Sequence, residues 1–205
     1  QAPLDFVVEQ DAADGTLDSY RTLYLADNHV SRAASAKIAE WVQNGGTLFA
    51  TAGAGMFDEY NQPNTVLREL LGVEQTELVK PDSDQVDFIK QDLRFVKPIG
   101  EVMLSNQKSK FPVFGALSKF TPAADAKISG TFADGSPAVT TRKVGAGQVT
   151  YCAFLPGLSY FFPAIPLKPL DRGATNDAMS HFIPTDFDRS VSALIGSAVK
   201  SIDRP

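Results

Sequence analysis

The stretch TLYLADNHVSRAASAKIAEWVQNGGTLFAT, residues 22–51, decides the fold. Its first five residues are almost continuously apolar, which is typical of a strand covered on both faces. Residues 34–42 then repeat apolar side chains at three- and four-residue spacing after Ser31, a good helix N-cap, and the glycine pair 45–46 is expected to end this helix. Residues 47–51 form a second apolar run. This order of strand, helix and strand predicts two parallel strands joined by a helix.

The segments around this unit extend the prediction to an α/β fold. Residues 4–9 form a β-branched and aromatic run that predicts a strand, and residues 64–71 carry apolar side chains on one helical face. Three strand-like runs within residues 126–155, separated by short glycine-containing turns, predict antiparallel hairpins. We therefore expect one domain over residues 1–205, with a flavodoxin-like, mostly parallel sheet flanked by helices and an added antiparallel β-hairpin region.

The rest of the chain is less regular. Residues 81–122 predict loops and short strands, at 101–104 and 112–116. Residues 154–169 are rich in proline and aromatic side chains, which predicts an irregular, partly buried loop. An amphipathic helix is expected after Thr185.

Composition excludes several classes of protein. The chain has 19 basic and 24 acidic residues, a net charge of −5, and no basic stripe interleaved with aromatic residues, so nucleic acid is not an expected partner. No stretch reaches the roughly 20 consecutive apolar residues of a membrane helix. Cys152 is the single cysteine, which excludes an internal disulfide and a multi-cysteine metal site. No cofactor or metal ion is predicted.

The chain begins at Gln1 rather than methionine, which fits a processed chain or an excised piece of a larger protein. A removed secretion signal would leave no trace in such a chain. We expect a soluble protein, and the sequence leaves open whether it is secreted or periplasmic.

Residues 20–31 and 38–51 resemble the class I glutamine amidotransferase-like domains that stand beside glycosidase barrels. The similarity continues through residues 58–61 and 67–73, and it is closest to the trimerisation domain of family 42 β-galactosidases. Residues 147–151 are also similar to the late glycine-then-strand step of that fold. The resemblance implies a bacterial, carbohydrate-related protein in which this domain assembles subunits.

Active amidotransferases carry a nucleophilic cysteine on the sharp turn after the strand equivalent to residues 47–50. The turn here reads Thr51-Ala52-Gly53-Ala54-Gly55 and has no cysteine. Thr51 is a weak substitute because no base can be assigned to it, and His181 lacks the carboxylate that follows the family's histidine. The resemblance therefore implies a pseudoenzyme without glutaminase activity.

Polar residues after the two parallel strands define a candidate ligand crevice, because open α/β sheets bind ligands at the carboxyl ends of their strands. The candidate residues are Asp27, Asn28, His29, Thr51, Ala52, Gly53, Asp58 and Glu59. The glycines of the second turn are expected to leave room for a ligand or another backbone.

Each of these candidates also has a purely structural interpretation. The favoured interpretation is that Asp58 and Glu59 cap the helix that begins near Asn64 or bind water, and that His29 is a loop residue hydrogen-bonded to backbone. Cys152 lies in an alternating strand without a partner base and is expected to be buried and inert.

Three functions remain open. The first is a non-catalytic module that mediates assembly or shapes a neighbouring active site, with other domains of a parent protein or further copies of itself as partners. The second is a domain that binds a small molecule or carbohydrate in the candidate crevice. The third is a hydrolase that uses Asp58, Glu59 and His29 as its acid and base groups.

Overall fold

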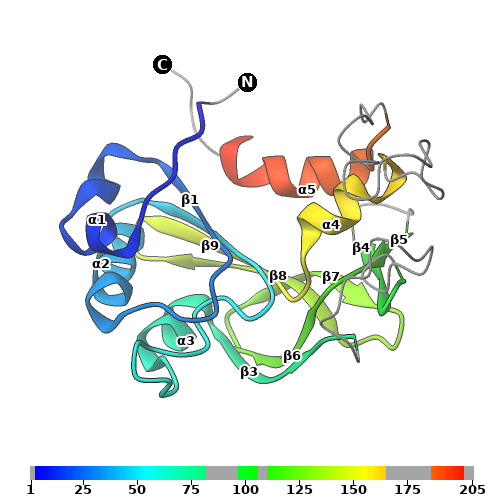
Figure 1. The fold of residues 1–205 in the computed structure, drawn as a ribbon, viewed down its shortest axis with the longest axis horizontal. Helices are drawn as coiled ribbons and strands as arrows, with labels where there is room; N and C mark the ends of the chain where they lie inside the picture. The colour runs from blue at the N-terminus through cyan, green and yellow to red at the C-terminus, as the bar shows by residue number, and fades with distance from the viewer. Residues whose placement is uncertain (1–2, 82–96, 106–109, 165–185, 201–205) are drawn as a thin grey trace, which may run out of the picture.

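The computed structural model describes residues 3–81, 97–105, 110–164 and 186–200 of the chain (Figure 1). The helices are α1 (Glu9–Ala13), α2 (Arg32–Gln43), α3 (Thr65–Leu71), α4 (Pro156–Phe161) and α5 (Arg189–Lys200), with 3-10 turns η1 (Thr16–Ser19) and η3 (Phe162–Ala164). The strands are β1 (Thr22–Leu25), β2 (Thr47–Ala50), β3 (Val73–Val79), β4 (Gly100–Leu104), β5 (Lys110–Val113), β6 (Leu117–Pro122), β7 (Lys127–Phe132), β8 (Pro137–Val144) and β9 (Gly147–Cys152). Across these described ranges, no helix is long and apolar enough to cross a membrane.

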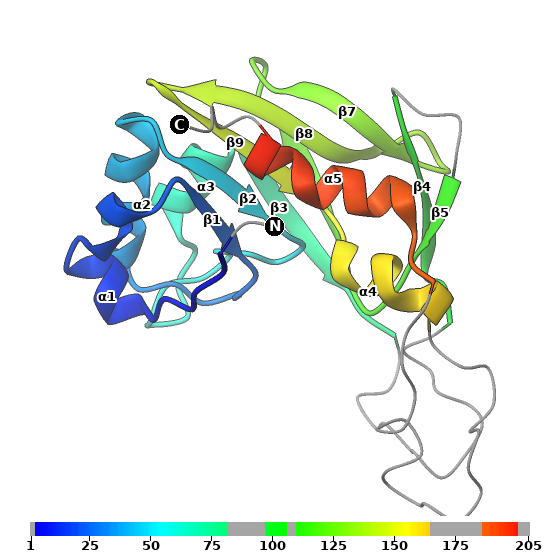
Figure 2. The ribbon, with the colours of Figure 1, turned by 90° about the horizontal axis from the view of Figure 1, so that it is seen from above.

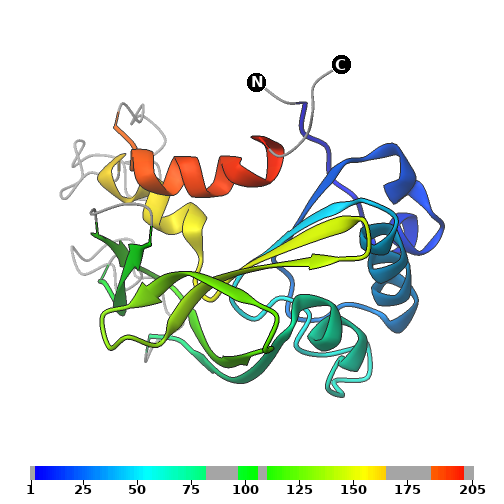
Figure 3. The ribbon, with the colours of Figure 1, turned by 180° about the vertical axis from the view of Figure 1, so that it is seen from behind.

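Seven of the strands form one sheet, in the order β1-β2-β9-β8-β7-β4-β5, and β3 pairs with β6 in a second, two-stranded sheet. Strand β2 is parallel to both β1 and β9. The other four pairs of the large sheet are antiparallel, as is the β3–β6 pair. The long β8–β9 hairpin crosses the middle of the molecule, and the large sheet curls from β1 to β5 (Figures 2 and 3).

The expected flavodoxin-like, mostly parallel sheet is therefore wrong. The strand after α3 would continue a parallel sheet, but β3 leaves it and pairs antiparallel with β6. The antiparallel strands, which were expected as an added region, instead make up most of the large sheet. One of them, β9, pairs directly with β2 in the interior of that sheet. What remains of the expected architecture is the β1-α2-β2 unit and its parallel register.

The alternation of strand side chains divides the core between the two faces of the large sheet. In β2, Leu48 and Ala50 pack with α2 and α3, whereas Phe49 packs on the opposite face with α5. Figure 2 shows α5 lying along this second face, beside α4. The helices thus cover opposite sides of the same strands, and all four residues of β2 are buried.

Helix ends follow the sequence signals closely. The Ser31 hydroxyl accepts from the Ala34 N–H (3.3 Å) and the Asn64 side-chain oxygen accepts from the Leu67 N–H (3.1 Å), so both residues are N-caps. Helix α3 ends at Gly72, whose φ of 64° is a left-handed conformation that favours glycine.

Several local expectations are wrong. Residues 4–8 are extended but form no strand, and Glu9 begins α1. The proline-rich stretch was expected to be irregular, yet it begins with α4, because Pro156 is at the first helical turn, where a proline nitrogen loses no hydrogen bond. Residues 165–169 and Thr185 lie outside the described residues, and Asp188 caps the start of α5.

Candidate functional site

The two loops that the sequence predicts at one crevice do lie side by side. Three backbone hydrogen bonds join them, from the Gly55 N–H to the Asp27 carbonyl (2.9 Å), from the Phe57 N–H to the Asn28 carbonyl (3.0 Å) and from the Val30 N–H to the Phe57 carbonyl (3.0 Å). The contact follows from the parallel pairing of β1 and β2, which brings the carboxyl ends of both strands to the same edge.

The space beside Gly53 is filled rather than open. Its φ is 80°, and a Cβ built there would overlap the side-chain oxygen of Asn28 and lie 3.1 Å from a methyl carbon of Leu78. Gly53 is therefore needed for its left-handed conformation and for close packing. The room that the glycine was expected to leave for a ligand is occupied by the protein itself.

A buried polar cluster surrounds this turn, and sequence reasoning missed it. The side-chain oxygen of Gln75 accepts hydrogen bonds from the Gly53 N–H (3.0 Å), the Ser118 hydroxyl (3.1 Å) and the Tyr151 hydroxyl (2.8 Å), and its amide donates to the Ala54 carbonyl (3.0 Å). Burial raises the pKa of Tyr151, which keeps its hydroxyl a neutral donor. Ser118 and Tyr151 lie 43 and 76 positions from Gln75, so no local pattern indicates the cluster.

Asp58 and Glu59 together hold the start of α2, not the helix at Asn64. The Asp58 carboxylate is 3% exposed and contacts Nε of Arg32 at 2.7 Å, while the Glu59 carboxylate accepts from the Arg32 backbone N–H at 2.8 Å. Asp58 also accepts from the N–H groups of Tyr60 and Gln62, both at 2.9 Å. The two carboxylates are thus engaged in fixing a loop to a helix, which disfavours a role in acid and base chemistry.

These contacts are expected to make the stability of the fold depend on pH in the acid range. Burial alone would raise the pKa of Asp58, but hydrogen bonds from the Gln62 N–H, Arg32 and the Tyr60 N–H outweigh it and lower the pKa below 3.8. A carboxylate whose pKa is lowered by folding stabilises the fold above its unfolded pKa, and this stabilisation is lost as the pH falls through the folded value.

We expect Asp58→Asn to flatten the acid side of the stability profile. Wild type should lose stability steeply below about pH 4, whereas the variant should start less stable at neutral pH and lose less on acidification. Denaturant unfolding at a series of pH values measures this. Asp27→Asn, in the exposed loop before α2, is the matched control and should keep the wild-type profile. Parallel profiles for wild type and Asp58→Asn would contradict the assignment.

His29 is an exposed loop residue whose partners, Asn61 and Phe57, belong to the neighbouring loop. Its Nε2 lies 3.0 Å from the side-chain oxygen of Asn61, and its ring stacks on Phe57 with centroids 5.4 Å apart. Asp58 does not contact it, because the Asp58 carboxylate is directed at Arg32. Among the described residues, no group of three or more His, Cys, Asp and Glu side chains is arranged to hold a metal ion.

Within the described residues, neither candidate nucleophile is paired with a base. The hydroxyl oxygen of Thr51 is buried and makes no hydrogen bond within the described part of the chain. Cys152 is 0% exposed on the face packed against α5, and burial raises the pKa of its thiol, so it is a structural cysteine as its strand pattern predicts. His181 lies outside the described residues.

Cys152 should accordingly react with thiol reagents only when the structure opens. We expect native labelling to be roughly 100-fold or more slower than labelling in denaturant, because the thiol is neutral and enclosed. A disulfide reagent that releases a coloured thiolate when it reacts with Cys152 measures both rates on the same sample. Comparable rates in the native and denatured states would overturn the burial of this residue.

The comparisons with known proteins agree with a domain of mixed sheet and flanking helices. The sequence profile of the beta-galactosidase trimerisation domain matches residues 2–161. This match covers more than half of the chain, and the chain therefore belongs to that family. No protein in a curated collection matches the sequence.

Solved structures support the same fold. A beta-galactosidase from Rahnella sp. R3 superposes with a TM-score of 0.56 at 21% identity, over 70% of this chain and 21% of that one. A GH42 beta-galactosidase from G. stearothermophilus, a catalytic mutant, gives 0.53 at 23% identity, over 66% and 19%. A cytoplasmic protein of Salmonella typhimurium gives 0.51 at 20% identity, over 70% and 63%. The chain thus spans about a fifth of the length of these beta-galactosidases.

Proposed function

We propose that this chain is a non-catalytic assembly module, which joins copies of its parent protein, and that the parent acts on carbohydrate. The observation that carries the proposal is the family match over residues 2–161 to a trimerisation domain. The proposal that the parent acts on carbohydrate is supported by the solved beta-galactosidases, because about a fifth of the length of each has the fold of this chain.

A glutamine amidotransferase-like origin is part of the same proposal. The β1-α2-β2 unit ends in a sharp turn at Gly53, at the place where an active amidotransferase carries its nucleophile. Here the position has no side chain, and the Gly53 N–H is already bonded to Gln75 and Ser118. A backbone donor that is used within the protein is not available to stabilise an oxyanion, which supports loss of catalysis.

An exposed apolar row supports contact between copies. Leu4, Phe6 and Val8 alternate along the extended segment before α1 and are 79%, 90% and 63% exposed. Their neighbours hold the segment in place, because Asp5 accepts from the Tyr20 hydroxyl at 2.7 Å and Val7 packs against the core. Large apolar side chains presented together on a fixed segment are typical of an interaction surface. We assign this row to the contact with another copy of the chain.

Light scattering after size-exclusion chromatography tests the proposal. The expected mass is three times 22.1 kDa at high protein concentration. Phe6→Ser should weaken assembly about 10- to 100-fold, because burying a phenylalanine side chain contributes about 1.5–3 kcal/mol. Val66→Ser changes a side chain on α3 that is 37% exposed and should leave assembly unchanged. A monomer at every concentration would reject the assembly role, and equal effects of the two variants would reject the interface.

Glutamine hydrolysis provides a separate test of the non-catalytic character. We expect no release of ammonia from glutamine, since the turn has neither a thiol nor a base. Ammonia release that is lost in Thr51→Ala would show that the Thr51 hydroxyl acts as a nucleophile.

A further inference from the structure

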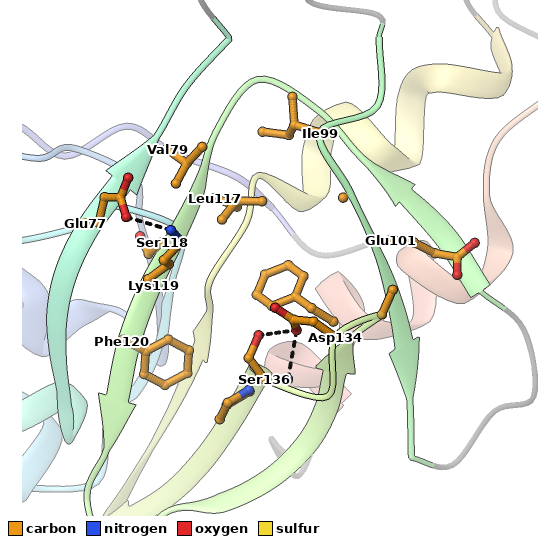
Figure 4. Close-up of a pocket in the computed structure, with 14 residues that line it drawn as sticks. Glu77, Val79, Ile99, Glu101, Leu117, Ser118, Lys119, Phe120, Asp134 and Ser136 are labelled. Carbon is orange, nitrogen blue, oxygen red and sulfur yellow. Dashed lines mark hydrogen bonds and ion pairs between the residues drawn. The ribbon is translucent and has the colours of Figure 1, made fainter.

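A cavity of about 520 Å³ lies where the two sheets separate (Figure 4). One wall comes from the β3–β6 pair and the other from β4 and the β7–β8 turn. Its volume lies within the range of about 300–1,000 Å³ that is usual for small-molecule sites. The sequence did not predict this cavity, because neither β3 nor β6 was expected as a strand.

The cavity has an apolar end. Val79, Ile99 and Leu117 converge there from three different segments, and each stays partly exposed (Figure 4). The rings of Phe120 and Phe132 also line the cavity and are likewise partly exposed. Apolar side chains that face a cavity without being covered provide a surface on which a flat apolar ligand face can pack.

Polar side chains line both walls of the cavity. The Asp134 carboxylate accepts from the backbone N–H and the hydroxyl of Ser136 through one oxygen, at 2.9 and 2.6 Å. Across the cavity, Lys119 forms an ion pair with Glu77 at 2.7 Å (Figure 4). The site therefore offers carboxylate acceptors and one ammonium donor around an apolar surface.

We propose that this cavity binds a single hexopyranose unit. A pyranose ring has one face of C–H groups, which fits the apolar end, and hydroxyls around its edge that both donate and accept. Hydroxyls can donate to the Asp134 carboxylate, and they can bridge the Glu77–Lys119 ion pair by donating to Glu77 and accepting from Lys119. The lining residues include three carboxylates, Glu77, Glu101 and Asp134, against the single ammonium of Lys119, so an organic cation is the competing ligand that the test has to exclude. The proposal does not rest on the assembly role.

Nuclear magnetic resonance of the full chain, titrated with methyl β-galactopyranoside and methyl β-glucopyranoside, tests this site. We expect saturable shifts of backbone amides at the cavity, in particular those of Lys119, Asp134 and Ser136. Asp134→Asn keeps an oxygen that can accept from Ser136, so the turn should persist, and it should weaken binding about tenfold through loss of a charged acceptor.

The control is Asp125→Asn, which changes a turn aspartate at the other end of β7 that pairs with Arg142 and does not line the cavity. It should leave sugar affinity unchanged. The proposal is overturned if neither sugar gives saturable shifts, if Asp134→Asn binds as tightly as the control, or if octylammonium binds more tightly than both sugars. Assembly, measured separately by light scattering, can fail or succeed without affecting any of these results.

Discussion

Replacing Gln75 with leucine should lower the free energy of unfolding by about 3 kcal/mol, because buried polar groups left without partners cost about 1–3 kcal/mol each. The substitution leaves the Tyr151 hydroxyl without its acceptor and the Ala54 carbonyl without its donor. The Gly53 N–H keeps the Ser118 hydroxyl at 2.9 Å. Denaturant unfolding followed by circular dichroism measures the loss.

Two further variants sharpen this test. Gln62→Leu changes an exposed glutamine and should alter stability by no more than about 0.5 kcal/mol. In Tyr151→Phe the hydroxyl is already absent, so the added cost of Gln75→Leu should be smaller than in wild type. Strict additivity of the two substitutions would show that the Gln75–Tyr151 contact contributes nothing to stability.

Gly147→Ala should be comparably destabilising, by about 3 kcal/mol, because it forces one extra carbon into closely packed backbone. A Cβ at Gly147 would overlap the carbonyl oxygens of Val42 and Gly46, at the point where β9 begins beside the end of α2. Backbone atoms cannot turn aside as a side chain can, so α2 and β9 would have to separate. The midpoint of thermal unfolding measures the effect.

The chain contains its own control for this substitution. A Cβ at Gly157 in α4 meets no atom within 4 Å, and alanine is a better helix former than glycine. Gly157→Ala should therefore be neutral or slightly stabilising. If Gly147→Ala behaved in the same way, the close approach of α2 and β9 would be incorrect.

The β1-α2-β2 unit was predictable because its signals are local. Apolar runs, a serine cap and a glycine stop lie within residues 22–51, and the structure places strand, helix and strand there. The direction of β3 had no such signal. Its burial alternates weakly, and its partner β6 lies about 40 positions away, so only tertiary pairing decides that it leaves the large sheet.

The position of the candidate site could be predicted from the sequence, but the contacts of its side chains could not. Parallel strands bring the loops at Asn28 and Gly53 together, as expected from strand order. Sequence could not show that the Asn28 side chain fills the space over Gly53, nor that Arg32 would pair with Asp58. Side-chain contacts of this kind depend on distances that residue spacing does not encode. Whether these residues bind a ligand stays a prediction.

The place of β9 beside β2 has a consequence for synthesis of the chain. Thr47 pairs with Gln148, about 100 positions later, so one edge of β2 has no partner until the last strand of the sheet has been made. At about 5–20 residues per second, this interval lasts roughly 5–20 s on the ribosome. An apolar strand with an open edge is prone to pair with other chains during that time. Chaperone protection of the nascent chain should therefore matter most while residues 51–147 are being added.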